Sequence, residues 1–312
     1  MYYSTSRNNI MQMTAKGWDE KTMNFKRIGV IGGGTMGQGI SEMLAAKGLD
    51  VLLVEETAEK LNHAYGMIET SLDKQLEKWA ITKAEKKLIL SKIHKVTHFA
   101  ELGTCDMVIE TISENLDAKR EVFKQLDQVC PSNIILASNT STLSLTEIAG
   151  STMYPERVIG MHFIYPVAKI NLVEIIRGLK TSDTTFEETK RFVEEIVDKH
   201  GIMVYESPGF VTSRIICLMI NEALHVLGEG VASPEDIDDA MRVGYQFQYG
   251  PLEMADRFGL DSVLAALERM FREFGELKYR PSFVLKKMVR AGSLGVKTGE
   301  GFFKYDKDGD RI

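Results

Sequence analysis

Cysteine is scarce in this chain of 312 residues. The three cysteines, Cys105, Cys130 and Cys217, are odd in number, widely spaced and form no CxxC pair. This pattern argues against a disulfide framework and against a cysteine zinc site, and it favours a reducing cytoplasm. No apolar run approaches the roughly 18 residues that a membrane span needs, and residues 1–27 contain no apolar core of a secretory signal. We therefore expect a cytoplasmic protein without a membrane partner.

A basic excess and two common site motifs are also missing. Lys and Arg number 38 against 44 Asp and Glu, so the formal net charge is −6. This balance argues against nucleic acid as the main partner, and it leaves local basic patches available for a phosphorylated ligand. His94 and His98 lie four apart without the glutamate of a zinc HExxH helix, so we expect no metal site. No Gly-Lys-Ser or Gly-Lys-Thr triplet occurs, which excludes a nucleoside-triphosphate loop.

Short apolar runs alternate with amphipathic stretches over residues 25–206 and then stop. Strands that alternate with helices indicate βαβ units, so we predict a Rossmann-type, mainly parallel sheet domain there. Residues 207–312 carry only helical patterns and predict an all-helical C-terminal domain. Residues 1–24 are polar and are expected to form a mobile extension. The predicted strands cover 28–31, 51–56, 107–110, 134–138, 157–163, 170–176 and 202–206.

A GxGxxG motif follows the first predicted strand, where a helix is expected to begin. Its first glycine permits a tight turn, the second lets a pyrophosphate approach the backbone, and the third allows close packing of helix and strand. A glutamate ends the next strand 23 residues after the first glycine, where a carboxylate binds the adenine ribose and repels the extra phosphate of NADP. The motif therefore predicts an NAD site. Its expected residues are Gly32, Gly34, Thr35, Met36, Gly37 and Glu55.

Three polar side chains lie at the ends of apolar strands or inside them. His162 follows GM in the run GMHF, and Ser141 belongs to the turn SNTS, so both are expected at the carboxyl edge of the sheet, where ligands bind. Glu174 interrupts the run LVEII, and a buried carboxylate needs a partner such as His162. The pair suits alcohol oxidation, since the imidazole removes the hydroxyl proton and the carboxylate holds its tautomer. A packed core histidine and a turn that caps a helix are the alternative interpretations.

Ordered motifs along residues 26–305 carry a resemblance to a known family. They include IGGGTMGQGI, VIETISENLDAKREVF, ILASNTSTLSLTEIA, RVIGMHF, LVEIIRG, PGFVTSR and GVKTGEGFF. With these motifs the chain resembles the L-3-hydroxyacyl-CoA dehydrogenases, nearest to the bacterial 3-hydroxybutyryl-CoA members. The resemblance implies reversible oxidation of an (S)-3-hydroxyacyl-CoA by NAD in a homodimer, with the helical domain at the dimer contact. It gives Ser141, His162 and Glu174 the roles of catalytic hydroxyl, base and orienting acid.

The same resemblance assigns binding residues. Glu114, Lys119 and Lys297 match residues that contact NAD in the family. Ser141 is expected to contact both the cofactor and the substrate as well. Ser71 and Lys78 match positions that touch the CoA moiety, through a poorly matched helix.

Two departures from the family pattern surround the expected acyl pocket. Tyr165 stands where the motif HFFNP has its asparagine, and we place Tyr165 among the substrate-binding residues. Ser213 stands where PGFxxNR has an active-site asparagine, and serine is shorter and lacks the amide. We place Ser213 among the catalytic residues. Because the proton-transfer set is unchanged, we expect dehydrogenase chemistry with an atypical acyl group or an altered efficiency.

Three alternatives stay open. One is another two-domain hydroxyacid dehydrogenase with a lysine base, which the order SNTS, MHF and VEII argues against. The second is a non-catalytic dinucleotide-binding or structural protein. The third is a specialised relative that acts on a branched, aromatic or amino-substituted acyl-CoA.

Overall fold

The computed structural model describes residues 23–312, so the predicted extension at 1–24 lies outside it except for its last two residues. The chain forms one eight-stranded sheet with the strand order β3-β2-β1-β4-β5-β6-β7-β8. The strands are β1 (Arg27–Ile31), β2 (Asp50–Val54), β3 (Ile93–Val96), β4 (Met107–Glu110), β5 (Ile135–Ser138), β6 (Val158–Phe163), β7 (Leu172–Arg177) and β8 (His200–Tyr205).

The sheet is mainly parallel, which confirms the predicted fold class. Strands β1 to β6 run parallel to one another. Strand β7 is antiparallel to β6 and parallel to β8. Only the segment 164–171 joins β6 to β7, and it is too short for the crossover that a parallel pair requires. The sequence pattern does not predict β3, because this four-residue edge strand has two adjacent exposed polar residues between buried Ile93 and Val96 and so lacks the alternation of a strand.

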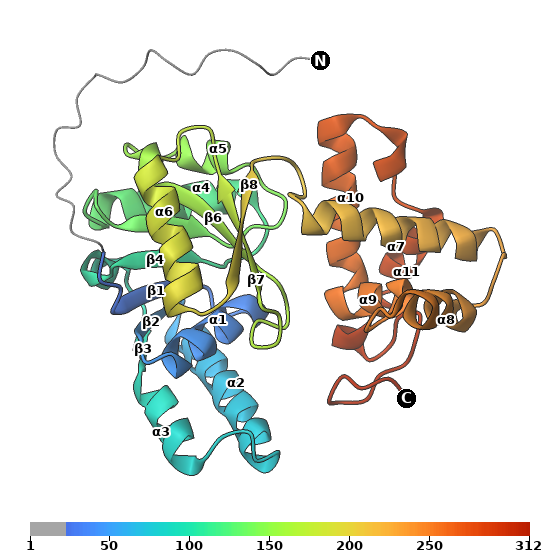
Figure 1. Ribbon diagram of the computed structural model, residues 1–312, viewed down its shortest axis with the longest axis horizontal. Coiled ribbons are helices and arrows are strands. Elements are labelled where there is room, and N and C mark those ends of the chain that lie inside the picture. Colours follow the sequence, from blue (N-terminus) through green and yellow to red (C-terminus); the bar gives the residue numbers. More distant parts are fainter. Residues whose placement is uncertain (1–22) are drawn as a thin grey trace.

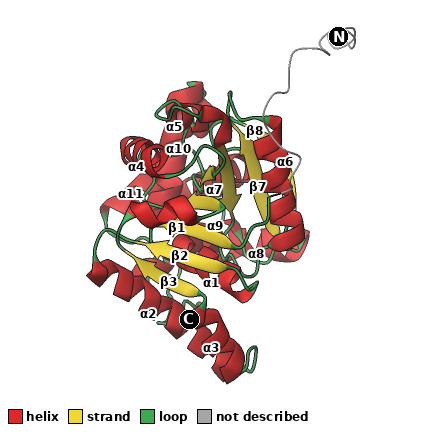
Figure 2. Cartoon of the chain, turned by 90° about the vertical axis from the view of Figure 1, so that its left-hand side faces the viewer, coloured by secondary structure: helices red, strands yellow, loops and turns green. Residues whose placement is uncertain are grey.

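Helices cover both faces of the sheet (Figure 1 and Figure 2). On one face Ile40, Ile68 and Phe186 belong to one buried core with the strands, and on the other face Phe123 and Ile148 belong to a second. Both cores exclude water from a sheet that is buried on each side, as parallel sheets are. These helices are α1 (Thr35–Ala46), α2 (Ala58–Glu77), α3 (Lys83–Ser91), α4 (Leu116–Val129), α5 (Leu145–Ala149) and α6 (Asp183–Arg191).

The elements after β8 are helical and enclose a third core. Figure 1 shows this part beside the sheet, joined to it by the segment between β8 and α7. The pattern predicts one helix over 251–274, whereas the structure breaks it at Gly259, which has φ +90°. Among the helices of residues 23–312, none is long and apolar enough to cross a membrane. The helices of this part are α7 (Thr212–Gly228), α8 (Pro234–Tyr245), α9 (Pro251–Phe258), α10 (Leu260–Phe274) and α11 (Phe283–Arg290).

Candidate active site

The glycine turn presents the N-terminus of α1 without a side-chain cap. Gly32 has φ +96°, and a Cβ on Gly37 would lie 1.8 Å from the carbonyl oxygen of Gly32, so strand and helix approach as closely as glycine permits. A Cβ on Gly34 would meet no protein atom within 4 Å. The first N–H groups of a helix have no internal acceptor. The turn is therefore packed on its helix side and open at Gly34, which fits a bound pyrophosphate.

Glu55 folds over this turn from the end of β2. Its Oε1 accepts a hydrogen bond of 2.5 Å from the backbone N–H of Gly33. The side chain is half-buried and makes no ion pair within residues 23–312. A carboxylate at this place beside the turn is suited to accept hydrogen bonds from ribose hydroxyls.

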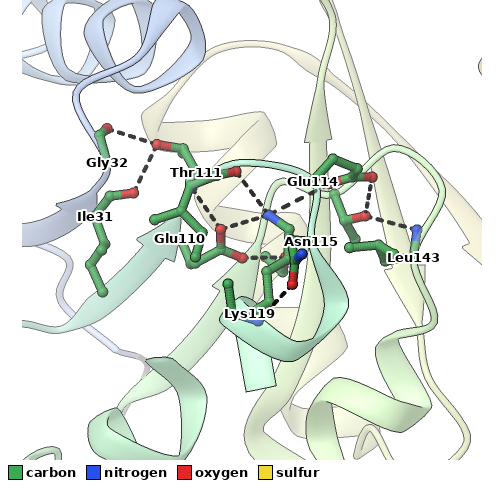
Figure 3. Close-up of polar contacts among 12 residues, drawn as sticks. Ile31, Gly32, Glu110, Thr111, Glu114, Asn115, Lys119 and Leu143 are labelled. Atoms are coloured by element: carbon green, nitrogen blue, oxygen red, sulfur yellow. Dashed lines mark hydrogen bonds and ion pairs between the residues drawn. The ribbon is translucent and has the colours of Figure 1, made fainter. Parts of the chain in front are cut away.

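A buried ion pair supports the next loop, after β4 (Figure 3). The ammonium of Lys119 lies 2.6 Å from Oε1 of Glu110, and both side chains are almost fully buried. Ser138 Oγ donates to the other Glu110 oxygen at 2.6 Å, and the N–H of Ile112 donates to Oε1 at 2.7 Å. Burial raises the pKa of Glu110, and the charge and hydrogen bond of Lys119 act against that rise. The network holds the Lys119 ammonium against the loop 111–114.

Glu114, at the end of that loop, gathers the SNTS turn. Its Oε1 accepts hydrogen bonds from Thr140 Oγ1 at 2.6 Å and from the N–H groups of Ser141 and Thr142, each at 3.0 Å. Its other oxygen lies 3.6 Å from the Lys119 ammonium. Burial raises the pKa of Glu114, but the charge of Lys119 and these donors outweigh it, and the net pKa is lowered. Glu114 is thus an anion that ties the loop after β4 to the turn after β5.

The Ser141 hydroxyl also points to this carboxylate, with a hydrogen bond of 3.3 Å to Glu114 Oε1. The same turn contacts the strand of His162, because the N–H of Phe163 donates to Asn139 Oδ1 at 2.9 Å. The structure therefore brings the SNTS turn, the Glu114 loop and the end of β6 to one edge of the sheet.

His162 and Glu174 form a direct pair. They lie opposite each other in the antiparallel register of β6 and β7, so their side chains share one face. Nδ1 of His162 lies 2.6 Å from Oε2 of Glu174, and both residues are buried. Burial raises the pKa of Glu174, but the hydrogen bond and charge of His162 and the donors of Thr212 outweigh it, so the net pKa is lowered. The imidazole then has its Nε2 free of this contact.

The start of α7 completes the environment of Glu174. Oε1 accepts hydrogen bonds from the N–H groups of Val211 and Thr212, at 3.0 and 2.9 Å, and Oε2 accepts from Thr212 Oγ1 at 2.7 Å. Phe210, with φ +49°, places its ring 6.1 Å from the His162 ring between centroids. Thr212 carries no functional signal in the sequence: it is the first residue of α7, after Val211 at the N-cap, and its contact with Glu174 depends on the packing of α7 against the sheet.

Among the described residues, the other residues named from the sequence make no hydrogen bond to this pair. Lys297 forms an ion pair with Asp261 in the helical part. Tyr165 is 48% exposed in the segment after β6. Ser213 is half-buried in the first turn of α7, next to the residue that contacts Glu174. The two residues expected to touch CoA, Ser71 and Lys78, lie in α2 and at its C-terminal end.

A cavity of about 930 Å³ lies between the sheet part and α10. Thr142, Leu143 and Ser144 line one side of it, and Glu206 and Arg269 line others. Its lining includes neither His162 nor the glycine turn, so the His162–Glu174 pair and the glycine turn belong to a different region.

Known families match almost the whole described chain. A model described as the NAD binding domain of 3-hydroxyacyl-CoA dehydrogenase matches residues 27–207, and a model described as the C-terminal domain of the same enzyme matches residues 209–305. This chain belongs to the 3-hydroxyacyl-CoA dehydrogenase family. The predicted resemblance, the NAD cofactor and the NAD-dependent oxidoreductase class of this enzyme are thereby confirmed.

Individual relatives cover nearly the same residues. The chain is 44% identical over 281 residues to a 3-hydroxybutyryl-CoA dehydrogenase of Clostridioides difficile, covering 90% of this chain and all of that one. It is 38% identical over 292 residues to human mitochondrial hydroxyacyl-coenzyme A dehydrogenase, with 91% and 93% covered. The crystal structure of (S)-3-hydroxybutyryl-CoA dehydrogenase from Ralstonia eutropha superposes with a TM-score of 0.84 at 44% identity, covering 91% of this chain and all of that one.

Proposed function

We propose that this dehydrogenase interconverts (S)-3-hydroxyacyl-CoA and 3-oxoacyl-CoA, with 3-hydroxybutyryl-CoA as a substrate, and that His162 is its general base and acid. The observation that carries the proposal is the buried contact of 2.6 Å between His162 Nδ1 and Glu174 Oε2. Relatives at 44% identity, named for the same activity, support the substrate class. Bound NAD+ supplies the hydride acceptor of the oxidation.

In the proposed mechanism, the protein moves one proton. Glu174 accepts a hydrogen bond from the Nδ1–H group of neutral His162, which leaves the lone pair of Nε2 for the substrate. Nε2 takes the proton of the 3-hydroxyl group as the C3–H bond transfers its electron pair and hydrogen to the cofactor. The imidazolium that forms is stabilised by the Glu174 carboxylate. In the reverse direction His162 returns this proton to the oxygen of the 3-oxo group.

Ser141 and the surrounding loops are proposed to orient the reactants. We propose that the Ser141 hydroxyl, 3.3 Å from Glu114 in this structure, turns to the reacting oxygen, because its turn contacts the end of β6 through Asn139. The backbone from Gly32 to Gly37 holds the pyrophosphate, and Glu55 accepts from the ribose. We propose that Glu114, Lys119 and Lys297 complete the cofactor site, Ser213 the catalytic set, and Ser71, Lys78 and Tyr165 the acyl-CoA site.

The replacement of His162 by alanine tests the base. We expect turnover of NADH with acetoacetyl-CoA to fall by about 10²–10⁴-fold, the usual contribution of a positioned acid or base. The affinity for NADH, followed by fluorescence, should stay nearly unchanged because the ring does not contact the glycine turn. His94→Ala, at the exposed edge strand β3, is the matched control and should keep wild-type turnover. A His162→Ala enzyme with wild-type rates would refute the assignment.

The second candidate is the same chemistry on an atypical acyl group. Tyr165, which is half-exposed, lies three residues after His162, and Ser213 lies next to Thr212. Because these residues are a tyrosine and a serine, neither supplies the asparagine amide of the family pattern. We expect kcat/KM for acetoacetyl-CoA to rise several-fold in Ser213→Asn and Tyr165→Asn, and to be highest for another acyl-CoA in the parent. Comparable activity on acetoacetyl-CoA in parent and variants would eliminate this candidate.

A further inference from the structure

We propose that Thr212 is a positioning residue that sets how strongly Glu174 holds the proton-bearing Nδ1 of His162. The inference rests on the proposed role of His162 as general base. The side chain of Thr212 reaches from the helical part to the sheet, and its hydroxyl shares Oε2 of Glu174 with the His162 imidazole.

The Glu174 carboxylate is fully occupied by donors. It is 0% exposed and accepts four hydrogen bonds, one from His162 and three from the start of α7. The two N–H groups of α7 bind Oε1, whereas the Thr212 hydroxyl and the His162 ring both bind Oε2, at 2.7 and 2.6 Å. An ionised carboxylate only accepts, so the threonine must donate its proton here.

Two donors on one oxygen act against each other. Each donor draws on the negative charge of Oε2, and a hydrogen bond to the charged form stabilises that charge. The Thr212 hydroxyl therefore weakens the hold of Glu174 on the imidazolium and fixes the plane of the carboxylate toward the ring. Without the hydroxyl, Oε2 belongs to His162 alone, the imidazolium becomes more stable, and the ring loses its proton at a higher pH.

No other charged side chain contacts this pair in the part of the chain that the structure describes. The ion pairs there give Glu174 no partner except His162. Arg214, the nearest cation along α7, donates to Tyr279 Oη at 2.8 Å and stacks on the ring of Phe274. On β8, the residue in register with Glu174 is Ile202. Besides the imidazole, Thr212 thus supplies the polar side chain that can change how strongly this carboxylate binds the His162 ring.

The test compares the pH dependence of Thr212→Val and Thr212→Ser with that of the wild type. Valine keeps the shape and removes the hydroxyl, and serine keeps the hydroxyl. For NADH-dependent reduction of acetoacetyl-CoA, we expect the alkaline limb of kcat/KM in Thr212→Val to move up by about 0.5–1 pH unit. Thr212→Ser should retain the wild-type profile. Thr189→Val is the control, since it removes a buried hydroxyl of α6 that binds only the backbone oxygen of Thr185.

A second measurement needs no turnover. The His162 imidazole, followed by NMR in the free folded protein, should titrate at a higher pH in Thr212→Val than in the wild type and in Thr189→Val. An unchanged midpoint in Thr212→Val, or an equal shift in Thr212→Ser, would overturn the inference. Wild-type turnover in His162→Ala would instead refute the proposed function, so the two failures are distinguishable.

Discussion

Glu110 and Glu174 are both buried in apolar strands, but their carboxylates are stabilised by different partners. Glu110 is neutralised by the ammonium of Lys119 at 2.6 Å, whereas Glu174 is held by an imidazole and by donors of the helical part. A buried charge without such partners costs several kcal/mol. At Glu110 the partner is the buried ammonium group of Lys119, which suits a structural support. At Glu174 the partner is an imidazole, the side chain that we propose as the base of the reaction.

The lowered pKa of Glu174 predicts a pH-dependent stability. Because the folded-state pKa lies below the ordinary value of 4.5, the ionised carboxylate stabilises the fold. This contribution is fully present above about pH 4.5 and is lost as the pH falls through the lowered pKa. We expect Glu174→Gln to cost about 1–3 kcal/mol near neutral pH, and this cost to shrink at acidic pH.

Urea unfolding of both proteins over a series of pH values measures that difference. Glu101→Gln, an exposed change at a distant 3₁₀ turn, provides the control and should leave the free energy of unfolding nearly constant. A cost of Glu174→Gln that does not change with pH would contradict the prediction.

At the scale of elements, the close approach of α1 to β1 determines the conformation of the glycine turn. The third glycine of the motif packs against backbone, and Thr111 Oγ1 locks the turn by donating to the carbonyl groups of Ile31 and Gly32, both at 2.9 Å (Figure 3). The N-terminus of α1 is aimed by this packing and not by a side-chain cap.

Gly37→Ala tests this geometry. The new Cβ would lie 1.8 Å from the carbonyl oxygen of Gly32, and backbone must move to relieve the clash. We expect a loss of about 1–3 kcal/mol in stability and a weaker affinity for NADH. Gly66→Ala, in the middle of α2 with no atom within 4 Å of the new Cβ, should instead stabilise the protein by about 0.5–1 kcal/mol. Urea unfolding and NADH titration measure both, and wild-type NADH affinity in Gly37→Ala would contradict the argument.

The antiparallel step from β6 to β7 is the other decisive element. Its register places Glu174 directly opposite His162. Since side chains alternate between faces along a strand, a shift of one residue would send the two side chains to opposite faces of the sheet.

For the whole molecule, the sheet and the helical part meet at the candidate site. Three of the four hydrogen bonds to Glu174 come from the start of α7, so the boundary that we propose at 206/207 lies only a few residues before a structural contact of the site. Reorientation of the helical part would therefore act directly on the contacts of Glu174.

We also expect a homodimer, as the family resemblance implies. The helical part exposes large apolar side chains, among them Phe283 at 71% and Val243 at 73%, which a second copy would cover. Light scattering after size exclusion should give about twice the chain mass of 35.0 kDa. Phe283→Glu should lower that mass, whereas Leu179→Glu, at a leucine of the sheet part that is 82% exposed, should not. A wild-type mass of one chain at micromolar concentration would refute the dimer.

The sequence alone determined the parts of this protein that depend on local patterns. The glycine spacing, the glutamate after β2 and the alternation of apolar runs are local signals, and they predict the Rossmann-type sheet, its helical partner and the NAD turn. The pairing of His162 with Glu174 also followed, because a carboxylate inside an apolar strand has to find a partner.

Only the tertiary structure decided which further groups contact the carboxylates of the candidate site. The donors of Thr212 and Val211 reach Glu174 across 37 or more residues of chain, and Glu114 accepts hydrogen bonds from residues 26 and 27 positions later. Edge strand β3 and the break at Gly259 depend likewise on neighbours distant in sequence. Periodicity reports which face of an element is buried, but contacts between elements depend on how their faces are packed together, and that packing is a property of the folded chain.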